Sequence, residues 1–168
     1  MKVAISSAHF PGGGASGLIS EVEEARKVVE AVASLLPDAV FFHDYTSTSQ
    51  DENLATLTEW HNSQSRQLDV SVHFNAYEPT EEPRGVEVLF LTADEIARSL
   101  ADAISQVGFI NRGAKQRTDL YLINNTDEPC VIIEICFVDS IADVEIYHEH
   151  FDAICGLIAL ALDRKDVA

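Results

Sequence analysis

The sequence predicts an α/β domain built on a largely parallel sheet. Short runs of apolar and β-branched residues alternate with longer segments that have the periodicity of helices, as expected when helices connect parallel strands. Residues 131–138 form an apolar run of strand length, of the kind found in a sheet covered on both faces. No internal repeat, linker or low-complexity segment interrupts this order. One domain over residues 1–168 is therefore expected.

Composition and charge restrict the kind of protein. The chain has 168 residues, of which 46% are hydrophobic and 23% charged, which suits a domain with its own core. Its formal net charge of −17 would be repelled by nucleic acid and by an anionic membrane surface, so neither is expected as a partner. The apolar part of the first residues is too short for a secretory signal, and no apolar run approaches the roughly 20 residues that span a bilayer.

The three cysteines are expected to be small buried hydrophobes. Cys130, Cys136 and Cys155 lie in apolar surroundings and form no Cys-x-x-Cys pair, so a thiolate zinc site is not predicted. Cys130 and Cys136 share one predicted strand, where six residues at about 3.3 Å each hold them too far apart for a disulfide.

The first part of the chain predicts two strands, a glycine-rich loop and two helices. The loop lacks the spacing of a phosphate-binding loop, although its glycines let the backbone approach a ligand closely. The first helix starts with the capping-box sequence Ser20-Glu-Val-Glu23. His61 is expected to be a half-buried packing residue, and the role of His43 stays open. In chain order the segments are strand 2–6, loop 7–17, helix 20–36, strand 38–45 and helix 51–65.

The second part predicts four strands, two helices and two loops. A second capping box, Thr92-Ala-Asp-Glu95, opens one helix, and Ser140 caps the other. The loop at 111–118 is basic. In chain order the segments are strand 68–75, loop 76–84, strand 85–91, helix 92–107, loop 111–118, strand 120–123, strand 131–138 and helix 140–162.

Glu134 is out of place in its strand. It lies near the middle of the apolar run Val131-Ile-Ile-Glu-Ile-Cys-Phe-Val138. An ionised carboxylate without a partner in such a setting costs many kcal/mol. Glu134 must therefore be protonated, paired with a cation, or placed where the strand opens onto a site. On this observation alone, a buried salt bridge with Arg or Lys explains it as well as a functional role.

Two histidines and a further acid can be placed at the same edge of the sheet. His9 lies just past the first strand, at the edge where open α/β sheets bind ligands. His73 lies near the carboxyl end of its strand, on the face that also carries Asp69 and Ser71. Taken singly, His9 would be interpreted as a surface residue. Glu21 would be interpreted as an acidic residue in the first turn of a helix, where the helix dipole stabilises negative charge. Together, two imidazoles, a carboxylate and a water make a common catalytic zinc site.

Four blocks of sequence, in register over nearly the whole chain, carry a resemblance. They are Ala8-His-Phe-Pro-Gly-Gly-Gly-Ala-Ser-Gly17, Glu21 before an amphipathic helix, Ser71-Val-His-Phe-Asn-Ala76, and Pro129-Cys-Val-Ile-Ile-Glu-Ile-Cys-Phe-Val-Asp-Ser140. Together they resemble the zinc-dependent N-acetylmuramoyl-L-alanine amidases of type 3, found as catalytic domains of phage endolysins and bacterial autolysins. The resemblance implies one domain with an open, mostly parallel sheet of about six strands and helices on both faces.

The resemblance also implies a site and a reaction. His9, Glu21 and His73 would bind one Zn²⁺ per chain, Glu134 would be the catalytic carboxylate, and Asn75 would support the site from behind the ligands. The implied reaction hydrolyses the amide between the lactyl group of N-acetylmuramic acid and L-alanine of the peptidoglycan stem peptide. Zinc would activate the water, and Glu134 would carry the proton.

The sequence departs from the family pattern at one point and leaves one ligand open. The family's first block usually reads Gly-His-Gly, whereas Ala8 and Phe10 flank His9 here. Glu24, further along the first helix, is the alternative to Glu21 as third ligand.

The expected partner is peptidoglycan, and the expected form is a monomer. The basic residues Arg112, Lys115 and Arg117 are candidates to meet the carboxylates of the stem peptide, although basic loops are usually only solvated. Because no wall-binding repeat follows, the chain works alone or is one domain of a longer enzyme. A phage enzyme held in the host cytoplasm until the membrane is breached is expected, with an exported or wall-associated enzyme as the alternative.

Two other functions fit the same residues. The chain would be a zinc hydrolase of another amide if its substrate were a peptide or a small N-acyl compound. It would be a non-catalytic wall-binding module if it kept the metal site without turnover. Comparing the release of free amino-terminal alanine from purified peptidoglycan with the hydrolysis of other amides tests the first alternative, and binding to cell walls without any loss of turbidity would favour the second.

Overall fold

The computed structural model describes residues 1–163, which form an α/β domain of six strands and six helices. The predicted fold class is confirmed, and residues 164–168 of the expected domain lie outside the described part. The strands are β1 (Val3–Ser7), β2 (Val40–Phe42), β3 (Leu68–Asn75), β4 (Val86–Phe90), β5 (Asn111–Gln116) and β6 (Cys130–Phe137). The helices are α1 (Glu21–Leu35), α2 (Gln50–Ser63), α3 (Asp94–Ser105), α4 (Tyr121–Asn125), α5 (Ile141–Glu149) and α6 (Phe151–Leu162).

The sheet is mostly parallel, as predicted. Its strand order is β2-β1-β3-β6-β4-β5. β4 runs antiparallel to β6, whereas the other neighbouring pairs are parallel. Since β1, β3 and β6 are parallel neighbours, their carboxyl ends meet at one edge, where ligands bind in open α/β sheets.

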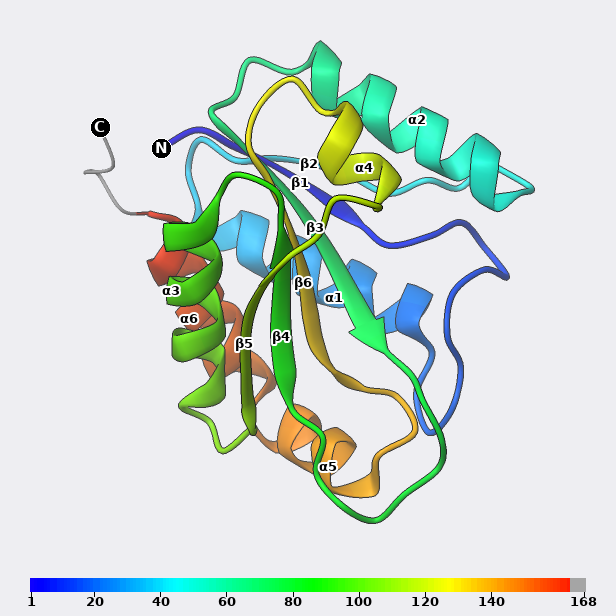
Figure 1. Ribbon diagram of the computed structural model, residues 1–168, viewed down its shortest axis with the longest axis vertical. Coiled ribbons are helices and arrows are strands. Elements are labelled where there is room, and N and C mark those ends of the chain that lie inside the picture. The colour runs from blue at the N-terminus through cyan, green and yellow to red at the C-terminus, as the bar shows by residue number, and fades with distance from the viewer. Residues whose placement is uncertain (164–168) are drawn as a thin grey trace.

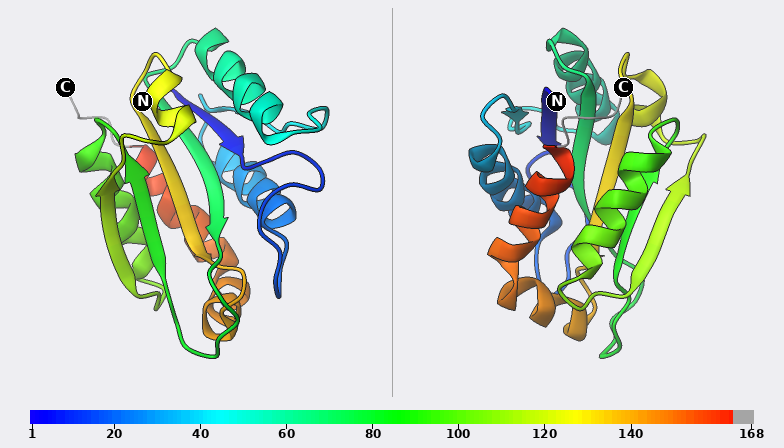
Figure 2. Two further views of the ribbon diagram at one scale, coloured as in Figure 1. Left: turned by 45° about the vertical axis from the view of Figure 1, so that its right-hand side comes forward. Right: turned by 90° about the vertical axis from the view of Figure 1, so that its left-hand side faces the viewer.

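Helices cover both faces of the sheet (Figures 1 and 2). α1, α6 and α3 pack side by side along one face, and α2 and α4 lie together on the other. α5 follows β6 beyond the carboxyl edge (Figure 1). Within residues 1–163, no helix combines the length and the apolar character needed to cross a bilayer.

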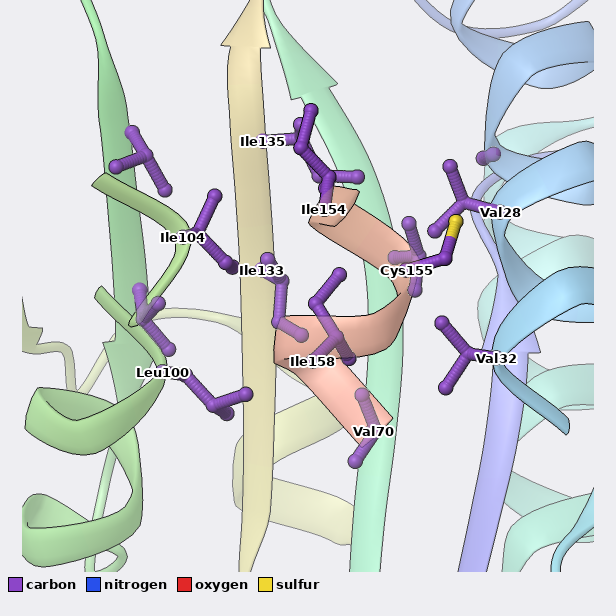
Figure 3. Packing of buried hydrophobic residues seen from close by; sticks show 14 of the residues in the cluster. Val28, Val32, Val70, Leu100, Ile104, Ile133, Ile135, Ile154, Cys155 and Ile158 are labelled. Atoms are coloured by element: carbon purple, nitrogen blue, oxygen red, sulfur yellow. The ribbon is translucent and has the colours of Figure 1, made fainter. Parts of the chain in front are cut away.

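The face under α1, α3 and α6 carries the main hydrophobic core. Figure 3 shows Ile133 and Ile135 of β6 and Val70 of β3 among side chains of these three helices. The helices contribute Val28, Val32, Leu100, Ile104, Ile154 and Ile158. Complete burial of an aliphatic side chain of this size contributes about 1.5–3 kcal/mol, so this face supplies much of the stability of the fold.

The opposite face is apolar only in part. A smaller cluster joins Leu57 of α2 and Leu122 of α4 to Leu89 and Ile132 of the sheet. Beside that cluster, β1 and β3 bury polar side chains under α2 without exposing them to solvent. These are Ser6, Asp69 and Ser71. The functional groups described below continue this polar surface toward the carboxyl edge.

Two segments differ from the prediction. Residues 111–116, expected in a basic loop, form the edge strand β5, because their backbone pairs with β4 while their side chains stay exposed or half-buried. Residues 120–123, expected as a strand, lie mostly in α4, which packs between α2 and β6. The adjacent residues Leu122 and Ile123 are both buried in one cluster, whereas a strand would send them to opposite faces.

The two predicted capping boxes are wrong, whereas the cap by Ser140 is confirmed. Ser20 is the N-cap residue of α1, as predicted, but within the described chain its side chain makes no capping hydrogen bond. α3 begins at Asp94 with Ala93 as its N-cap residue, so Thr92 lies outside the helix. Ser140 Oγ accepts a hydrogen bond from the third backbone N–H of α5, at 3.2 Å.

The predicted last helix, 140–162, is two helices. His150 separates α5 from α6, with φ −116° and ψ 19°. The bend lets α6 leave the carboxyl edge and pack along the sheet between α1 and α3 (Figure 1).

Candidate metal centre

Three of the predicted site residues meet at the carboxyl edge of the sheet. His9 comes from the loop after β1, Glu21 opens α1, and His73 lies near the end of β3. Glu21 Oε1 lies 3.2 Å from His9 Nε2 and 3.0 Å from His73 Nδ1. One potential ligand atom from each residue lies within 4.8 Å of the other two. Segments distant in sequence therefore bring together the set expected for a metal.

The glycine-rich loop holds His9 in an unusual backbone conformation. Its φ is 58°, in the left-handed region that residues with a side chain rarely adopt. Backbone strain of this kind is often found at functional sites. Gly14 permits the close approach of the loop, since a Cβ there would lie 2.7 Å from His9 Cδ2 and 2.9 Å from Glu21 Oε2. The loop is thus folded around the two candidate ligands.

Glu21, and not its alternative Glu24, lies beside the histidines. Glu21 Oε2 accepts a hydrogen bond from the Ala15 backbone N–H at 2.6 Å, which fixes the carboxylate. Glu24 instead accepts from Lys27 Nζ and from the Tyr147 hydroxyl. Burial acts to raise the pKa of Glu21, but the hydrogen bonds and charges of the two histidines outweigh it and hold the pKa well below its usual range.

The donor set fits zinc. Two imidazole nitrogens and one carboxylate oxygen, with a fourth position for water, are the ligands of many catalytic zinc sites. The other ring nitrogens are held from outside: His9 Nδ1 lies 3.2 Å from Gln50 Oε1, and His73 Nε2 lies 3.1 Å from Ser71 Oγ. Such outer contacts orient imidazoles that bind metals. Burial opposes protonation of His73, but the carboxylate of Glu21 outweighs it and raises the pKa of His73, and the same negative charge attracts a cation.

Glu134 lies beside His73 on the neighbouring strand. The β3–β6 register pairs the two residues, so their side chains share one face. The salt bridge considered as the alternative is not formed within residues 1–163, where Glu134 Oε2 is buried without a hydrogen-bond partner. Burial raises the pKa of Glu134 to about 7, opposed by His73 and reinforced by Glu21 and Glu87. A pKa near neutrality suits a group that both accepts and releases a proton.

Sequence reasoning missed Glu87, which lies opposite Glu134 in the antiparallel pair β4–β6. Its carboxylate accepts hydrogen bonds from Arg112 Nε at 2.9 Å, from Lys115 Nζ and from Asn75 Nδ2 at 3.1 Å. Three of the four predicted supporting or substrate-binding residues thus meet at one acid. Burial acts to raise the pKa of Glu87, but the two cations outweigh it and lower the pKa. The signal for Glu87 was an acid inside an apolar strand, the signal that singled out Glu134.

The remaining candidates have other partners. Arg117 forms a surface ion pair with the aspartate two residues later. His61, expected to be half-buried, is fully buried and bonds to Asp69. His43 is also buried, with Nδ1 2.9 Å from Ser7 Oγ. This pair does not act as a histidine and a serine nucleophile, because Ser7 is fully buried and cannot reach a substrate.

The cysteines are buried free thiols in the described chain, as predicted. Burial raises the pKa of Cys155 to about 12, and it also raises the pKa values of Cys130 and Cys136. Their thiols stay protonated, so they act as packing groups rather than as metal ligands.

Two cavities adjoin the centre. The larger, of about 480 Å³, lies between the sheet and the helices α2 and α4, and its polar lining includes His73, Asn75, Glu87 and Glu134. The smaller, of about 310 Å³, shares Asn75 and is lined further by Tyr77, Arg84, Arg112 and Phe137. The smaller cavity, which is lined by Arg84 and Arg112 and is called the cationic pocket below, therefore adjoins the larger cavity beside the candidate metal ligands.

One family model and two curated relatives match the chain. Residues 3–164 match the family model described as N-acetylmuramoyl-L-alanine amidase. An uncharacterised 38.4 kDa protein of Clostridium perfringens is 35% identical over 168 residues, covering 94% of this chain and 49% of that protein. A second uncharacterised protein, from strain 13 of the same species, is 33% identical over 178 residues, covering 99% of this chain and 53% of that protein. The chain thus spans about half the length of these curated relatives.

Solved structures share the fold. The catalytic domain of the CD27L endolysin, described as targeting Clostridia difficile, matches with a TM-score of 0.87 at 24% identity, covering 100% of this chain and 99% of that one. An N-acetylmuramoyl-L-alanine amidase from Clostridium difficile 630 matches with a TM-score of 0.76 at 20% identity, covering 98% of each chain. With the family model matched over nearly all of its length, this chain belongs to the N-acetylmuramoyl-L-alanine amidase family.

Proposed function

We propose that this chain hydrolyses the amide bond between the lactyl group of N-acetylmuramic acid and the L-alanine of the peptidoglycan stem peptide. The observation that carries the proposal is the grouping of His9, Glu21 and His73, with Glu134 beside them on the next strand. Membership of the amidase family supports this choice of substrate and bond. A module that only bound cell walls would have no need of a half-buried carboxyl group, with one buried oxygen that lacks a hydrogen-bond partner in the described chain, next to the three donors.

We propose that one zinc ion per chain is held by His9 Nε2, His73 Nδ1 and a carboxylate oxygen of Glu21. When bound, zinc supplies Lewis-acid activation of water and of the amide carbonyl. Gln50 and Ser71 hold the outer nitrogens of the two rings, so each imidazole keeps its inner nitrogen directed toward Glu21.

Glu134 carries the proton in this reaction. As a carboxylate it accepts a proton from the attacking water, whose oxygen forms a bond to the carbonyl carbon. It then donates that proton to the amide nitrogen as the C–N bond breaks. The products are a stem peptide with a free L-alanine amine and a lactyl carboxylate on the glycan. The pKa of about 7 suits both steps.

We propose that the cationic pocket accepts a carboxylate of the stem peptide. Arg112 and Arg84 lie over the ring of Phe137, 5.1 and 5.6 Å from its centroid. Lys115 and Arg112 share the carboxylate of Glu87, which fixes both cations next to the site. In a chain with a net charge of −17, a local excess of positive charge is needed to hold an anionic peptide.

We propose that the enzyme works as a monomer at the cell wall. The likeness to an endolysin domain supports a phage enzyme that stays in the host cytoplasm until the membrane is breached, with an exported wall enzyme as the alternative. Light scattering of the purified chain measures its molar mass in solution and so tests whether it is a monomer. Lysis of producing cells only after the membrane is permeabilised would support the phage enzyme.

Purified peptidoglycan tests the reaction. With one equivalent of zinc, the protein should release peptides whose new amino terminus is L-alanine, identified by amine labelling and mass spectrometry. Chelation should abolish this release, and added zinc should restore it. Release of other amines without alanine would point to a different amide hydrolase, and wall binding without any new amine would point to a binding module. Either result would refute the proposal.

The metal ligands are tested by a matched pair of variants on α1. Glu21→Gln should lower the zinc content of the purified chain well below one equivalent. Glu23→Gln, an exposed change two residues later, should leave it at one. Equal zinc content in both variants would remove Glu21 from the proposed ligands.

A further inference from the structure

A chain of hydrogen-bonded polar side chains lies buried under α2 and ends at one of the proposed metal ligands. We call it the polar chain, and its members in order are His73, Ser71, Ser6, His61, Asp69 and Arg66. The four members between the ends have no exposed surface. The chain runs from the carboxyl edge of β3 to its first residues, so it links the site to the opposite edge of the sheet.

The links nearest the site join two serines on adjacent strands. His73 Nε2 lies 3.1 Å from Ser71 Oγ. Ser6 Oγ donates a hydrogen bond to Ser71 Oγ at 3.4 Å, and the β1–β3 register places these serines side by side. Ser71 Oγ has two acceptor lone pairs, so it can accept from Ser6 and from His73 at once.

The links farther from the site come from α2 and from the start of β3. His61 Nε2 lies 3.0 Å from Ser6 Oγ, and His61 Nδ1 lies 2.7 Å from Asp69 Oδ1. Arg66 donates to both oxygens of Asp69, at 2.9 and 3.2 Å from its Nε. Both nitrogens of the His61 ring are thus fixed, and the carboxylate at the end is held by a bidentate arginine.

The arrangement follows from the period of a strand. Asp69, Ser71 and His73 point to one face of β3 because they are two residues apart, but alternate residues lie nearly 7 Å from each other, too far for Asp69 to reach Ser71. Ser6 from β1 and His61 from α2 fill that gap. Three separate elements therefore contribute to one continuous set of contacts.

Burial of so many polar groups needs a reason beyond packing. Hydrogen-bonded polar groups and ion pairs inside a protein often stabilise it no more than apolar residues of the same volume. The same face of the sheet is apolar a few residues away, where Leu57 and Ile132 pack together. Apolar side chains could fill this space, so the polar chain is costly as a packing device.

We propose that the polar chain positions His73 for the metal, an inference that rests on the metal site proposed above. Ser71 Oγ accepts the Nε2–H of His73, which leaves the Nδ1 lone pair on the side of Glu21, 3.0 Å from its carboxylate. The Ser71 hydroxyl is held in turn by Ser6, and Ser6 by His61. The orientation of one metal ligand therefore depends on residues that touch neither metal nor substrate.

Zinc affinity of purified variants tests the inference. Ser71→Ala removes the acceptor next to His73, and Ser6→Ala breaks the chain one link farther away, each with the loss of one oxygen atom. Thr58→Val is the matched control, because Thr58 lies on α2 with His61, is 9% exposed, and bonds to Leu54 O of its own helix. Affinity is measured by competition with a chromophoric chelator, and the absorption spectrum of the cobalt-substituted protein reports the ligand geometry.

We expect Ser71→Ala to weaken zinc binding by about 10–100-fold and to change the cobalt spectrum, and Ser6→Ala to act in the same direction by a smaller factor. The double variant should bind no more weakly than Ser71→Ala alone, because both changes interrupt one chain. Thr58→Val should bind zinc like the wild type. If Ser6→Ala does not fold, His61→Gln interrupts the same link.

Three results would overturn the inference. Wild-type zinc affinity in both serine variants, with lower thermal stability, would make the chain a structural feature only. Additive losses in the double variant would show that the two serines act separately. A wild-type protein that binds no zinc would refute the metal site itself, and it is distinguished from the other two results because it needs no variant.

Discussion

The two faces of one sheet differ in what they bury. Under α1, α3 and α6, the strands present an aliphatic surface in which Ile133 and Val70 have no exposed area. Under α2 and α4, the same strands present Ser71, His73 and Glu134. Because side chains alternate along a strand, Ile133 and Glu134 are sequence neighbours with opposite environments. A single residue step along β6 crosses from the core to the candidate site.

Within each strand, side chains on the aliphatic face therefore contribute mainly to the stability of the fold, and side chains on the polar face supply the groups for the proposed chemistry. The aliphatic face gains free energy from burial, at about 25 cal/mol for each Å² of apolar surface. The polar face gains less, because desolvation of its carboxylates and imidazoles opposes their hydrogen bonds. Departures from local folding rules are expected at functional sites, and here Ser71, His73 and Glu134 all lie on one face of the sheet. Substitutions on the two faces should therefore have different consequences.

Glu134→Gln should have the largest effect on the polar face. The amide cannot carry the proton, so hydrolysis of peptidoglycan should fall by about 10²–10⁴-fold. The free energy of unfolding in chelator should stay the same or rise, since the change removes the charge of a carboxylate whose Oε2 is buried without a partner in the described chain. Alanine release and urea unfolding measure the two quantities, with exposed Glu59→Gln as control. Retention of more than a tenth of the activity would remove Glu134 from its role.

Ile133→Ala tests the opposite face at the adjacent residue. Ile133 is fully buried among side chains of three helices (Figure 3), and its truncation should lower the free energy of unfolding by about 2–5 kcal/mol. At a temperature where the variant stays folded, its rate of alanine release should remain within a few-fold of the wild type. If activity fell as much as in Glu134→Gln, the two faces would not be separable.

Much of this arrangement could be predicted from sequence because it rests on local periodicity. The alternation in residues 68–75 placed His73 on a polar face, and the apolar run around Glu134 marked that acid as exceptional. The order of strands and helices was enough for the fold class. The order of strands also allowed His9, Glu21 and His73 to be placed at one edge of the sheet, and the resemblance to a family then implied that all three bind one metal ion.

The failures have a common physical cause, which is that partners distant in sequence decided the outcome. β5 is a strand because β4 offers it a pairing edge, although its own residues are polar. Glu87 lies in an apolar strand as Glu134 does, but its contacts with Arg112 and Lys115 could not be predicted because these partners lie on another strand. None of these contacts leaves a signal in a short window of sequence.

At low pH, the contacts that hold α2 on the polar face of the sheet should lose stability first. Asp44 is buried after β2 and ties α2 to the sheet, with Oδ2 accepting from Asn53 Nδ2 at 2.8 Å. Burial acts to raise its pKa, but hydrogen bonds from Ser47 and Asn53 outweigh it and lower the pKa from 3.8 to about 2. A depressed pKa contributes stability that is complete above the unfolded value. That contribution, at most about 2.5 kcal/mol, should be lost as the pH falls from 3.8 toward 2.

Hydrogen exchange at pH 5 and pH 3 measures this loss. Amides of α2 should lose protection at the lower pH more than amides of α6, which packs on the aliphatic face. In Asp44→Asn the free energy of unfolding should depend less on pH over this range than in the wild type. An identical pH dependence would show that Asp44 does not contribute the effect.

The smallest effect is expected at the cationic pocket. Arg112→Gln should raise KM by about three- to tenfold for stem peptides with free carboxylates, because a charge-assisted contact at a half-exposed side chain contributes about 1 kcal/mol. Peptides with the same carboxylates amidated should show little change. Arg98→Gln is the control, since the side chains of Arg98 and Asp94 form an exposed ion pair on α3. The comparison of two substrates is essential because Arg112 also donates to Glu87, whose position opposite Glu134 could be disturbed by the same change. A disturbance of that kind would slow hydrolysis of both peptides equally, and this result would refute recognition by the pocket. Recognition of charge would instead raise KM only for the peptide with free carboxylates.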